Sequence, residues 1–320
     1  MNVLGKSLKA LLVMSLFLVA CNKKIEDEAL PSEDPTAPTV DTVLIVTFKT
    51  AVGFTLSWNA ATDDNTAAAD LLYKAVYSTA DNITTADDAE ANGTTLMDWT
   101  ANTLTTNAAG LTHSTNYYFA VLVKDADSKI SYEGGSTTTL CTGKKMFLAT
   151  VSGGNFGGKA GADAACVAQK PDGGTYKAVI ADNTNINTTT GQPADLSSRQ
   201  ACYGNCEAST LYVMDWTLTT NQVYCTADFT KKVGATTAYP VLYVSEANVM
   251  SATPVKLFTG FNIAWGNAYG STCNDWTSTA GTFVGGTSTG TYTSQSTHEL
   301  ISTFPFPSCA GAGAVICAEQ

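Results

Sequence analysis

Cysteine is the residue type with the most evident chemistry in this 320-residue chain, which holds nine cysteines but only two histidines. Cys21 stands alone near the amino terminus, and the other eight all follow residue 140: Cys141, Cys166, Cys202, Cys206, Cys225, Cys273, Cys309 and Cys317. The spacing of Cys202 and Cys206 suits a pair of zinc ligands, but no second close pair and no neighbouring histidine accompanies it. We therefore expect disulfides, and the 105 connectivities open to eight cysteines cannot be reduced by spacing alone.

Carboxylates form a second candidate site. Asp63, Asp64, Asp125 and Asp127 lie in two predicted loops. Carboxylate oxygens are the ligands that Ca²⁺ prefers, but aspartate is also a common turn residue. Turn formation is the reading we adopt, so no metal site is predicted.

No arrangement of residues predicts catalysis. The chain lacks a nucleophile elbow, an HExxH motif and a paired Cys/His arrangement. The glycine-rich run from Gly153 to Lys159 superficially resembles a phosphate loop, but it lacks the Gly-Lys-Ser/Thr ending, and we expect an exposed turn there. We predict neither an enzyme nor a bound cofactor.

The charge balance excludes two further classes of protein. Acids outnumber bases 28 to 17, and Arg199 is the only arginine. Binding to a nucleic-acid backbone requires Lys and Arg to neutralise phosphates, so a nucleic-acid partner is not expected. His113 and His298 are too few and too far apart in sequence for a multi-histidine metal site, and we place His113 in a surface turn.

The first 20 residues have the pattern of a secretory signal. Lys6 and Lys9 precede an apolar run that ends at Ala20, and this run is too short to span a bilayer. Leu18 to Cys21 (LVAC) resembles a bacterial lipobox, which predicts cleavage before Cys21 and acylation of that cysteine. Loss of residues 1–20 removes two lysines and no acid, so 15 bases and 28 acids leave a net charge of −13.

Residues 21–38 then form a lipidated tether, because they are polar, acidic and contain proline. The acyl chains predict a membrane partner and a place at the outer membrane or cell surface.

Residues 39–140 predict a β-sandwich, because several segments alternate with a period of two between turn-forming stretches. Phe54, Leu56 and Trp58 share one face of such a segment, and Tyr117 opens another at 117–124. No segment of helical length and period interrupts them.

These residues resemble the fibronectin type III module. The resemblance rests on Trp58, Tyr73 and the run from Leu111 to Tyr117, in which the leucine stands six residues before the tyrosine. In that family the tyrosine hydroxyl bonds back to the backbone and closes a corner. The usual proline of the corner is His113 here.

Residues 141–320 predict a mixed α+β domain that is stapled by disulfides. We expect strands at 146–151, 176–180 and 314–318, and an alanine-rich helix at 161–169. Long loops rich in Thr, Ser, Asn and Gly lie between them. The chain as a whole is therefore predicted to be mostly β.

This second domain resembles endostatin, which has a C-type-lectin-like fold. The resemblance rests on the segments 161–178, 265–276 and 308–319, whose order and approximate spacing are kept. The nearest resemblance is to the leptospiral endostatin-like lipoproteins, which pair such a domain with a lipobox. Endostatin's histidine-rich zinc site and arginine-rich heparin surface have no counterpart, since no histidine lies between 114 and 297 and Arg199 is the only arginine.

The resemblance implies two nested bridges, Cys166–Cys317 and Cys273–Cys309. A local Cys202–Cys206 bridge would then leave Cys141 with Cys225. Asn274 and Asp275 are similar to the calcium- and sugar-binding residues of true lectins, although the flanking Cys273 and Trp276 favour a structural role. Trp216, Trp265 and Trp276 would make either a sugar platform or part of a buried core.

The function that this resemblance implies is adhesion. We expect a non-catalytic surface lipoprotein that binds host extracellular-matrix or complement proteins. A carbohydrate- or calcium-binding lectin and a structural envelope lipoprotein are the alternatives. The sequence names neither the ligand nor the loops that contact it.

Overall fold

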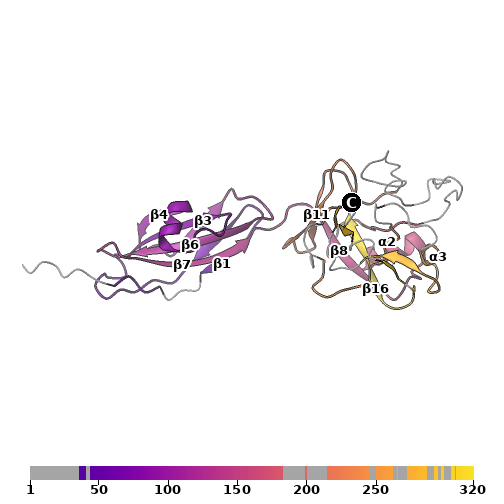
Figure 1. Cartoon of the computed structure of the whole chain (residues 1–320), viewed down its shortest axis with the longest axis horizontal. Helices are drawn as coiled ribbons and strands as arrows, with labels where there is room; N and C mark the ends of the chain where they lie inside the picture. The colour runs from indigo at the N-terminus through magenta and orange to yellow at the C-terminus, as the bar shows by residue number, and fades with distance from the viewer. Residues whose placement is uncertain are drawn as a thin grey trace, which may run out of the picture.

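The computed structural model divides the chain into two folded parts that follow one another along its longest axis (Figure 1). It describes residues 36–40, 44–182, 199, 215–244, 250–261, 265, 272–286, 292–294, 297–298, 304–306 and 308–320. The predicted signal segment, Cys21 and most of the tether lie outside the described residues, as do Cys202 and Cys206. No helix among the described residues is long and apolar enough to cross a bilayer.

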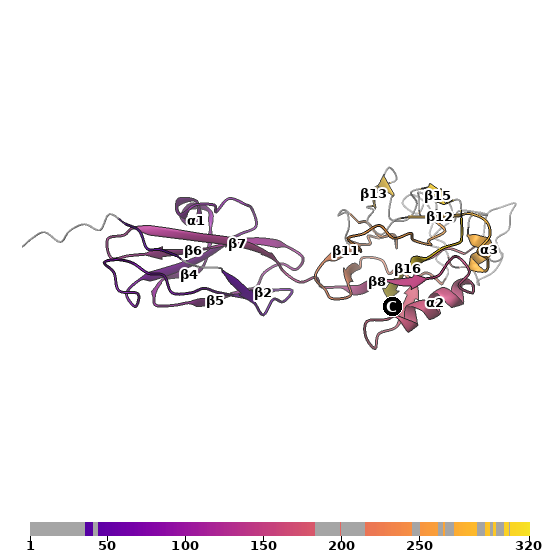
Figure 2. The same ribbon diagram turned by 90° about the horizontal axis from the view of Figure 1, so that it is seen from below.

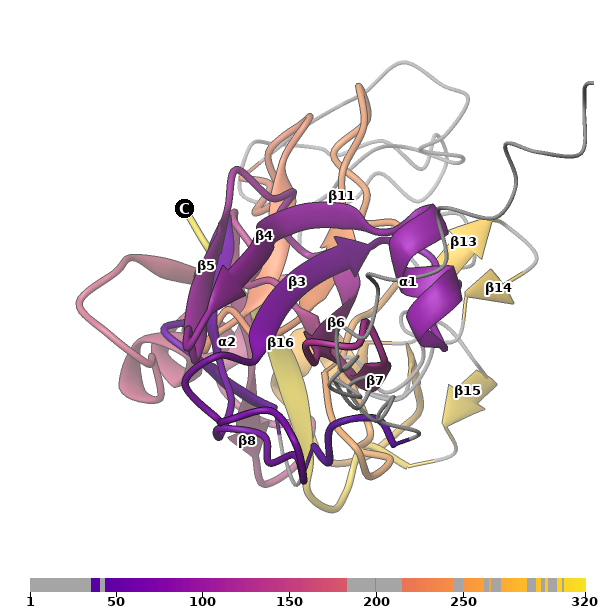
Figure 3. The same cartoon turned by 90° about the vertical axis from the view of Figure 1, so that its left-hand side faces the viewer.

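The first part is a sandwich of two antiparallel sheets. One sheet has the order β1-β2-β5, and the other has the order β4-β3-β6-β7, whose strands follow one another across the view in Figure 3. The strands are β1 (Ile45–Thr47), β2 (Gly53–Ser57), β3 (Leu72–Ser78), β4 (Thr94–Ala101), β5 (Thr105–Ala109), β6 (Asn116–Lys124) and β7 (Ile130–Thr138).

The faces predicted from sequence alternation are the ones that meet between the sheets. Phe54, Leu56 and Trp58 are buried against Tyr73 and Phe119 in a single core. Alternating side chains reach this core because successive residues of a strand point to opposite faces. The predicted fold class is therefore confirmed for this part, which is a fibronectin-III-like sandwich.

The tyrosine corner is also present. The Tyr117 hydroxyl accepts a hydrogen bond of 2.9 Å from the backbone N–H of Thr112, and Leu111 is buried beside it. His113 occupies the position of the usual proline and is half-buried, with Ser114 after it in the left-handed region at φ 51°. The corner therefore forms without proline.

A short helix, α1 (Ala86–Asn92), covers the outer face of the four-stranded sheet and is absent from the sequence prediction (Figure 2). Thr85 caps it by accepting a hydrogen bond from the N–H of Asp88. Ala89 packs on Ala120 and Leu122, which point away from the sandwich core. Seven residues are too few to show a helical period, so the cap is the only local signal.

The second part is built on a five-stranded mixed sheet of order β11-β10-β8-β16-β9. Its strands are β8 (Lys144–Val151), β9 (Tyr176–Ala178), β10 (Val223–Thr226), β11 (Lys232–Ala235) and β16 (Gly313–Glu319). The central strand β8 runs parallel to β10 and antiparallel to β16. The remaining elements are α2 (Gly158–Ala168), α3 (Cys273–Trp276), β12 (Phe283–Gly285), β13 (Tyr292–Ser294), β14 (Thr297–His298) and β15 (Phe304–Phe306).

The predicted strands and helix of this part correspond to β8, α2, β9 and β16, so the mixed α+β class is confirmed. The hairpin of β10 and β11 was not predicted, because its two strands are only four residues long each. Helix α2 packs on one face of the sheet, which buries Ala162 and Cys166 (Figure 2).

The two parts are joined without a free linker. The N–H of Leu140 donates to the carbonyl of Thr50, and its carbonyl accepts from the N–H of Ser114, so Leu140 is bonded to the sandwich on both sides. The next residue, Cys141, donates its N–H to the carbonyl of Phe229 and forms a disulfide with Cys225 in β10. Leu140 therefore belongs to the sandwich, and the next residue, Cys141, belongs to the second part.

Candidate functional site

Among the described residues, three disulfides connect the second part, and they involve six of the predicted cysteines. The pairs are Cys141–Cys225, Cys166–Cys317 and Cys273–Cys309, with sequence separations of 84, 151 and 36 residues. The second and third are the nested pairs that the endostatin resemblance implies. Cys166–Cys317 ties α2 to strand β16 of the sheet. Of these three disulfides, it closes the longest stretch of chain, 151 residues.

The sole arginine lies at the centre of a charged network, which sequence reasoning missed. Arg199 is fully buried, and its two terminal nitrogens each donate to the Asp163 carboxylate at 2.7 Å. The same guanidinium contacts Asp215 at 3.0 Å and the carbonyl of Ala178 at 2.8 Å. A lone arginine in a chain of few charges is a signal for such a site, because a buried guanidinium requires paired acceptors.

Lysines complete the network around Asp215. Lys159 and Lys177 contact its two carboxylate oxygens at 3.1 and 2.7 Å. Burial would raise the pKa of Asp215, but the hydrogen bond from Lys177 and the charge of Arg199 outweigh burial and hold the pKa well below its usual range. Burial raises the pKa of Asp182, although the N–H of Arg199 donates to its carboxylate at 3.0 Å. These groups hold Arg199 against α2 and β9.

The predicted lectin-like pair lies in a left-handed turn. Cys273, Asn274, Asp275 and Trp276 have φ values of 53–64°. Each left-handed residue of this kind costs about 1–2 kcal/mol. The side chain of Asn274 donates to the hydroxyl of Thr277, and Asp275 accepts from the hydroxyl of Thr272. Both polar side chains therefore stabilise the turn in which they lie, as the structural reading of Cys273 and Trp276 predicts.

The glycine-rich run packs against this turn, so the expectation of an exposed turn is wrong for part of it. Gly153 and Gly154 are buried, and a Cβ at Gly154 would lie 2.4 Å from the sulfur of Cys273. The N–H groups of Phe156 and Gly157 both donate to the carbonyl of Trp276. Glycine is needed here for close approach to a disulfide, a reason that sequence alone does not reveal.

The three tryptophans do not form an exposed platform. Trp265 and Trp276 are fully buried, and the indole N–H of Trp276 donates to the carbonyl of Ala181. Trp216 is half-buried and donates to the carbonyl of Pro240. The buried-core interpretation therefore describes them better than a sugar-stacking surface.

Two of the four aspartates of the sandwich loops, Asp63 and Asp125, cap turns. Asp63 accepts from the N–H groups of Asn65 and Thr66, and Asp125 accepts from the N–H of Lys129. The loops adjoin, because the hydroxyl of Thr66 accepts from the N–H of Ala126. One further oxygen of Asp63 and one of Asp125 is buried without a hydrogen-bond partner.

Asp64 accepts a hydrogen bond from the hydroxyl of Thr36, and Asp127 is exposed. Across the described ranges, no three His, Cys, Asp or Glu side chains converge as a metal cage would require. The two loops are thus joined by the hydrogen bond between Thr66 and Ala126, and Asp63 and Asp125 each cap the turn in their own loop.

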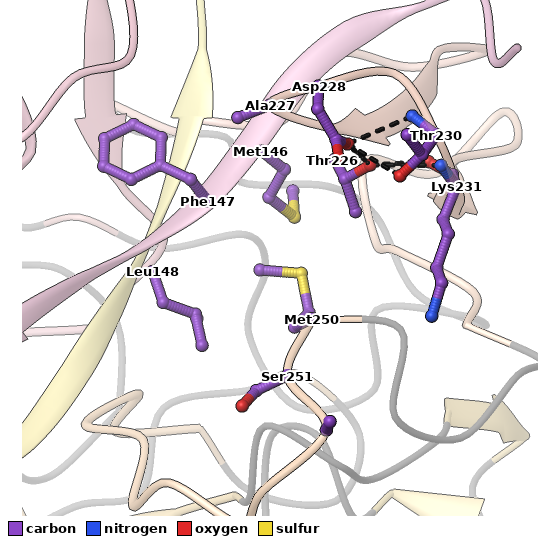
Figure 4. Close-up of a pocket in the computed structure, with 11 residues that line it drawn as sticks. Met146, Phe147, Leu148, Thr226, Ala227, Asp228, Thr230, Lys231, Met250 and Ser251 are labelled. Carbon is purple, nitrogen blue, oxygen red and sulfur yellow. Dashed lines mark hydrogen bonds between the residues drawn. The ribbon is translucent and has the colours of Figure 1, made fainter.

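A cavity of about 540 Å³ opens beside strand β8 (Figure 4). Met146 and Met250 point toward one another across it, and Leu148 lies below them. At its polar end the Asp228 carboxylate accepts from the hydroxyls of Thr226 and Thr230 at 2.6 and 2.8 Å. The hydrogen bond from Thr226 lowers the pKa of Asp228 more than burial raises it.

The cavity follows the edge of a strand. It is lined by three consecutive residues, 146–148, which point to alternate faces, so only the strand edge touches all three. The partner strand β10 ends opposite Met146. Four residues further along, the N–H and C=O of Thr150 are both bonded to the side-chain amide of Gln169.

Leu148 lies between these two positions. Because the backbone groups of alternate residues point to the same side, the N–H and C=O of Leu148 face this open edge and not β16. Within the described part of the chain, neither group is bonded to β10. Among the described residues, no strand is therefore paired with this side of β8 beyond Met146.

The fold defines a two-part β protein, in which a fibronectin-III-like sandwich precedes a disulfide-stapled α+β unit. Residues 149–293 match the profile of a family described as a protein of unknown function (DUF1554). This match lies wholly in the second part. A search of curated proteins finds no match.

Solved structures similar to the chain are fibronectin type III domains. The sixth such domain of human fibronectin type III domain containing protein 3 is 15% identical, covering 33% of this chain and 89% of that one, with a TM-score of 0.26. The third such domain of human KIAA0343 protein is 15% identical, covering 34% and 87%, with a TM-score of 0.24. The sandwich is assigned here from its strand order, its core and its tyrosine corner, and not from these scores.

Proposed function

We propose that this chain is a non-catalytic binding protein of a bacterial cell surface, which contacts host extracellular-matrix or complement proteins. The observation that carries the proposal is the cavity beside β8, where the flexible thioether of Met250 adjoins a strand edge that no described strand pairs beyond Met146. Methionine adapts its shape to varied apolar partners, and an open edge accepts a strand by backbone hydrogen bonds. Together they suit a protein ligand better than a small molecule.

The strongest charged cluster supports a non-catalytic role. Arg199, Asp163 and Asp215 are paired with one another, and Lys159 and Lys177 are paired with Asp215. A catalytic acid, base or nucleophile must reach a substrate with its reactive atom. These groups instead hold Arg199 against α2 and β9.

Two features of the chain support a surface lipoprotein of the endostatin-like kind. Cys21 ends the apolar leader in a lipobox-like sequence, so the acyl chains on that residue would hold the protein at the outer membrane. The pairs Cys166–Cys317 and Cys273–Cys309 coincide with those implied by the endostatin resemblance. A lectin role is less well supported, because Asn274 and Asp275 are bonded within their own turn.

Binding of the mature chain to immobilised laminin, fibronectin and complement factor H tests the proposal. We expect saturable binding to at least one of them at low micromolar concentration. Met250→Asp places a charge in the cavity and should weaken that binding at least tenfold. Val167→Asp is the matched control, because Val167 is 52% exposed on α2 and does not line the cavity.

Two results would contradict the proposal. Absence of saturable binding to all three proteins removes the adhesive function. Equal weakening by Met250→Asp and Val167→Asp removes the cavity as the contact surface, since the effect would then follow from added charge alone. Thermal unfolding of both variants checks that each remains folded.

A further inference from the structure

A second cavity, of about 420 Å³, lies where the two parts of the molecule meet. The sandwich contributes Lys49, from the segment between β1 and β2. It also contributes hydroxyl and amide groups at the end of β6 and β7 that lies next to the connection at Leu140 and Cys141, which we call the joint. The second part contributes the turn between β10 and β11. The full lining is Lys49, Ser114, Asn116, Thr138, Thr230, Lys231 and Lys232.

We call this cavity the joint cleft. The charge of its lining is opposite in sign to the net charge of the chain. Three lysines line it and no acid does, although acids outnumber bases 28 to 17 in the whole sequence. Across the described residues, no carboxylate lies within 4 Å of the ammonium groups of Lys49, Lys231 or Lys232. Asp228, on the same turn as Lys231, accepts from Thr226 and Thr230 and does not line the cleft.

The neutral groups of the cleft are suited to an anion as well. The Thr138 hydroxyl donates to the carbonyl oxygen of the Asn116 side chain at 3.2 Å, so the amide nitrogen of Asn116 remains a donor. The Ser114 hydroxyl lies along the same wall, whereas the single proton of the Thr138 hydroxyl is already donated to Asn116. Ammonium, amide and hydroxyl donors are the groups that proteins present to sulfate and phosphate oxygens.

The joint holds the two walls of the cleft in place before any ligand arrives. Leu140 is bonded to Thr50 and Ser114 of the sandwich, and Cys141 is bonded to Phe229 and joined to Cys225. Ser114 belongs both to this joint and to the cleft lining. A ligand therefore need not order the two parts, which removes part of the entropic cost of binding.

We infer that the joint cleft binds a tetrahedral oxyanion ester, the chemical group shared by sulfated glycans and phosphorylated lipid headgroups. The three lysines attract the anion, and the hydroxyl and amide donors orient its oxygens. This site adjoins the cavity beside β8, because Thr230 and Lys231 line both, whereas Lys49 and Lys232 line only the joint cleft. Because its contacts are exposed and ionic, its affinity should fall steeply as the salt concentration rises.

Isothermal titration of the mature chain with sucrose octasulfate tests this inference. We expect saturable binding in 50 mM salt, weakened at least tenfold by 500 mM salt, and no heat from unmodified sucrose. The double variant Lys49→Ala/Lys232→Ala should weaken binding at least tenfold. Lys129→Ala is the matched control, because Lys129 is an exposed lysine at the opposite end of the β6–β7 hairpin.

Co-sedimentation with vesicles of phosphatidylcholine and phosphatidic acid distinguishes the two sources. Stronger lysine-dependent binding to these vesicles than to the octasulfate would assign the ester to a lipid, and the reverse would assign it to a glycan. Lack of saturable binding to both probes would overturn the inference. Equal losses in the double variant and in Lys129→Ala would overturn it too, since net charge alone would then explain the binding. Failure of the matrix-protein assay leaves both results unaffected.

Discussion

At the scale of single residues, Arg199 contributes more to the stability of the second part than any local sequence feature suggests. Its guanidinium is buried, while the carboxylates of Asp163 and Asp215 are each about one quarter exposed. Breaking such a pair leaves partly buried charge without a partner, and that loss costs more than the pair itself contributes. The partial exposure of the two aspartates reduces the cost below that of a fully buried pair.

Replacing Arg199 with methionine should therefore lower the free energy of unfolding of the second part by about 2–3 kcal/mol. Urea unfolding, followed by tryptophan fluorescence, measures this change. Lys129→Ala removes an exposed positive charge and should change stability by less than about 0.5 kcal/mol. A loss below about 1 kcal/mol for the Arg199 variant would show that the network does not hold the fold.

Asp172 gives the molecule an acid-sensitive contact. Hydrogen bonds from Lys145, the N–H of Gly174 and Tyr176 lower the pKa of Asp172 to about 2. Because the folded-state pKa lies below the unfolded value of 3.8, this contact stabilises the fold above pH 4 and is lost as the pH falls toward 2.

We therefore expect Asp172→Asn to flatten the dependence of the melting temperature on pH between 4 and 2. Thermal unfolding at half-unit steps of pH measures it, with Asp127→Asn on an exposed loop as control. Parallel melting curves for the variant and the parent protein across that range would exclude a contribution from Asp172.

At the scale of elements, the glycine-rich run shows what sequence patterns miss. Gly154 approaches the Cys273–Cys309 disulfide so closely that an added Cβ would lie 2.4 Å from the sulfur of Cys273 and 3.2 Å from the Cβ of Cys309. Gly173, in the turn after α2, has no atom within 4 Å of the corresponding position. A substitution by alanine would therefore cause a clash at Gly154 and would meet open space at Gly173.

Gly154→Ala should destabilise the second part by about 2 kcal/mol or more, because buried backbone and a disulfide must shift to make room. Gly173→Ala should be neutral or slightly stabilising, since it restricts the unfolded chain without a clash. Differential scanning calorimetry compares the two directly. Similar melting temperatures for both variants would mean that the run does not pack on the disulfide.

The elements that were predictable from sequence are those with long, regular patterns. Strands β2, β3 and β6 follow from alternation, and α2 follows from its run of alanines. Helix α1 and the β10–β11 hairpin are too short for a period to emerge, and tertiary contacts fix them.

The candidate sites were less predictable than the fold. The cavity beside β8 depends on where β10 ends relative to β8, and the joint cleft depends on residues about 180 positions apart, from Lys49 to Lys232. No local spacing encodes either of these distances. The nested disulfides came from a family resemblance and not from the spacing of the cysteines.

At the scale of the whole molecule, two folded parts are joined at Leu140 and Cys141, and two adjoining cavities share Thr230 and Lys231. The predicted mature charge of −13 makes attraction of the molecule to polyanions unfavourable, and the three lysines of the joint cleft oppose this locally. Acyl chains on Cys21 would hold this molecule at the membrane, and the tether would set it off by about 20–25 Å as a flexible coil. Contact with host proteins further requires that the molecule face outward.

Proteolysis of intact bacterial cells tests that requirement most directly, because a protein enclosed by the outer membrane cannot act as an adhesin. Added protease should cleave the protein while a periplasmic marker stays intact and the cells remain sealed. Protection of the protein until the outer membrane is permeabilised would contradict the account, and would favour a structural envelope lipoprotein instead.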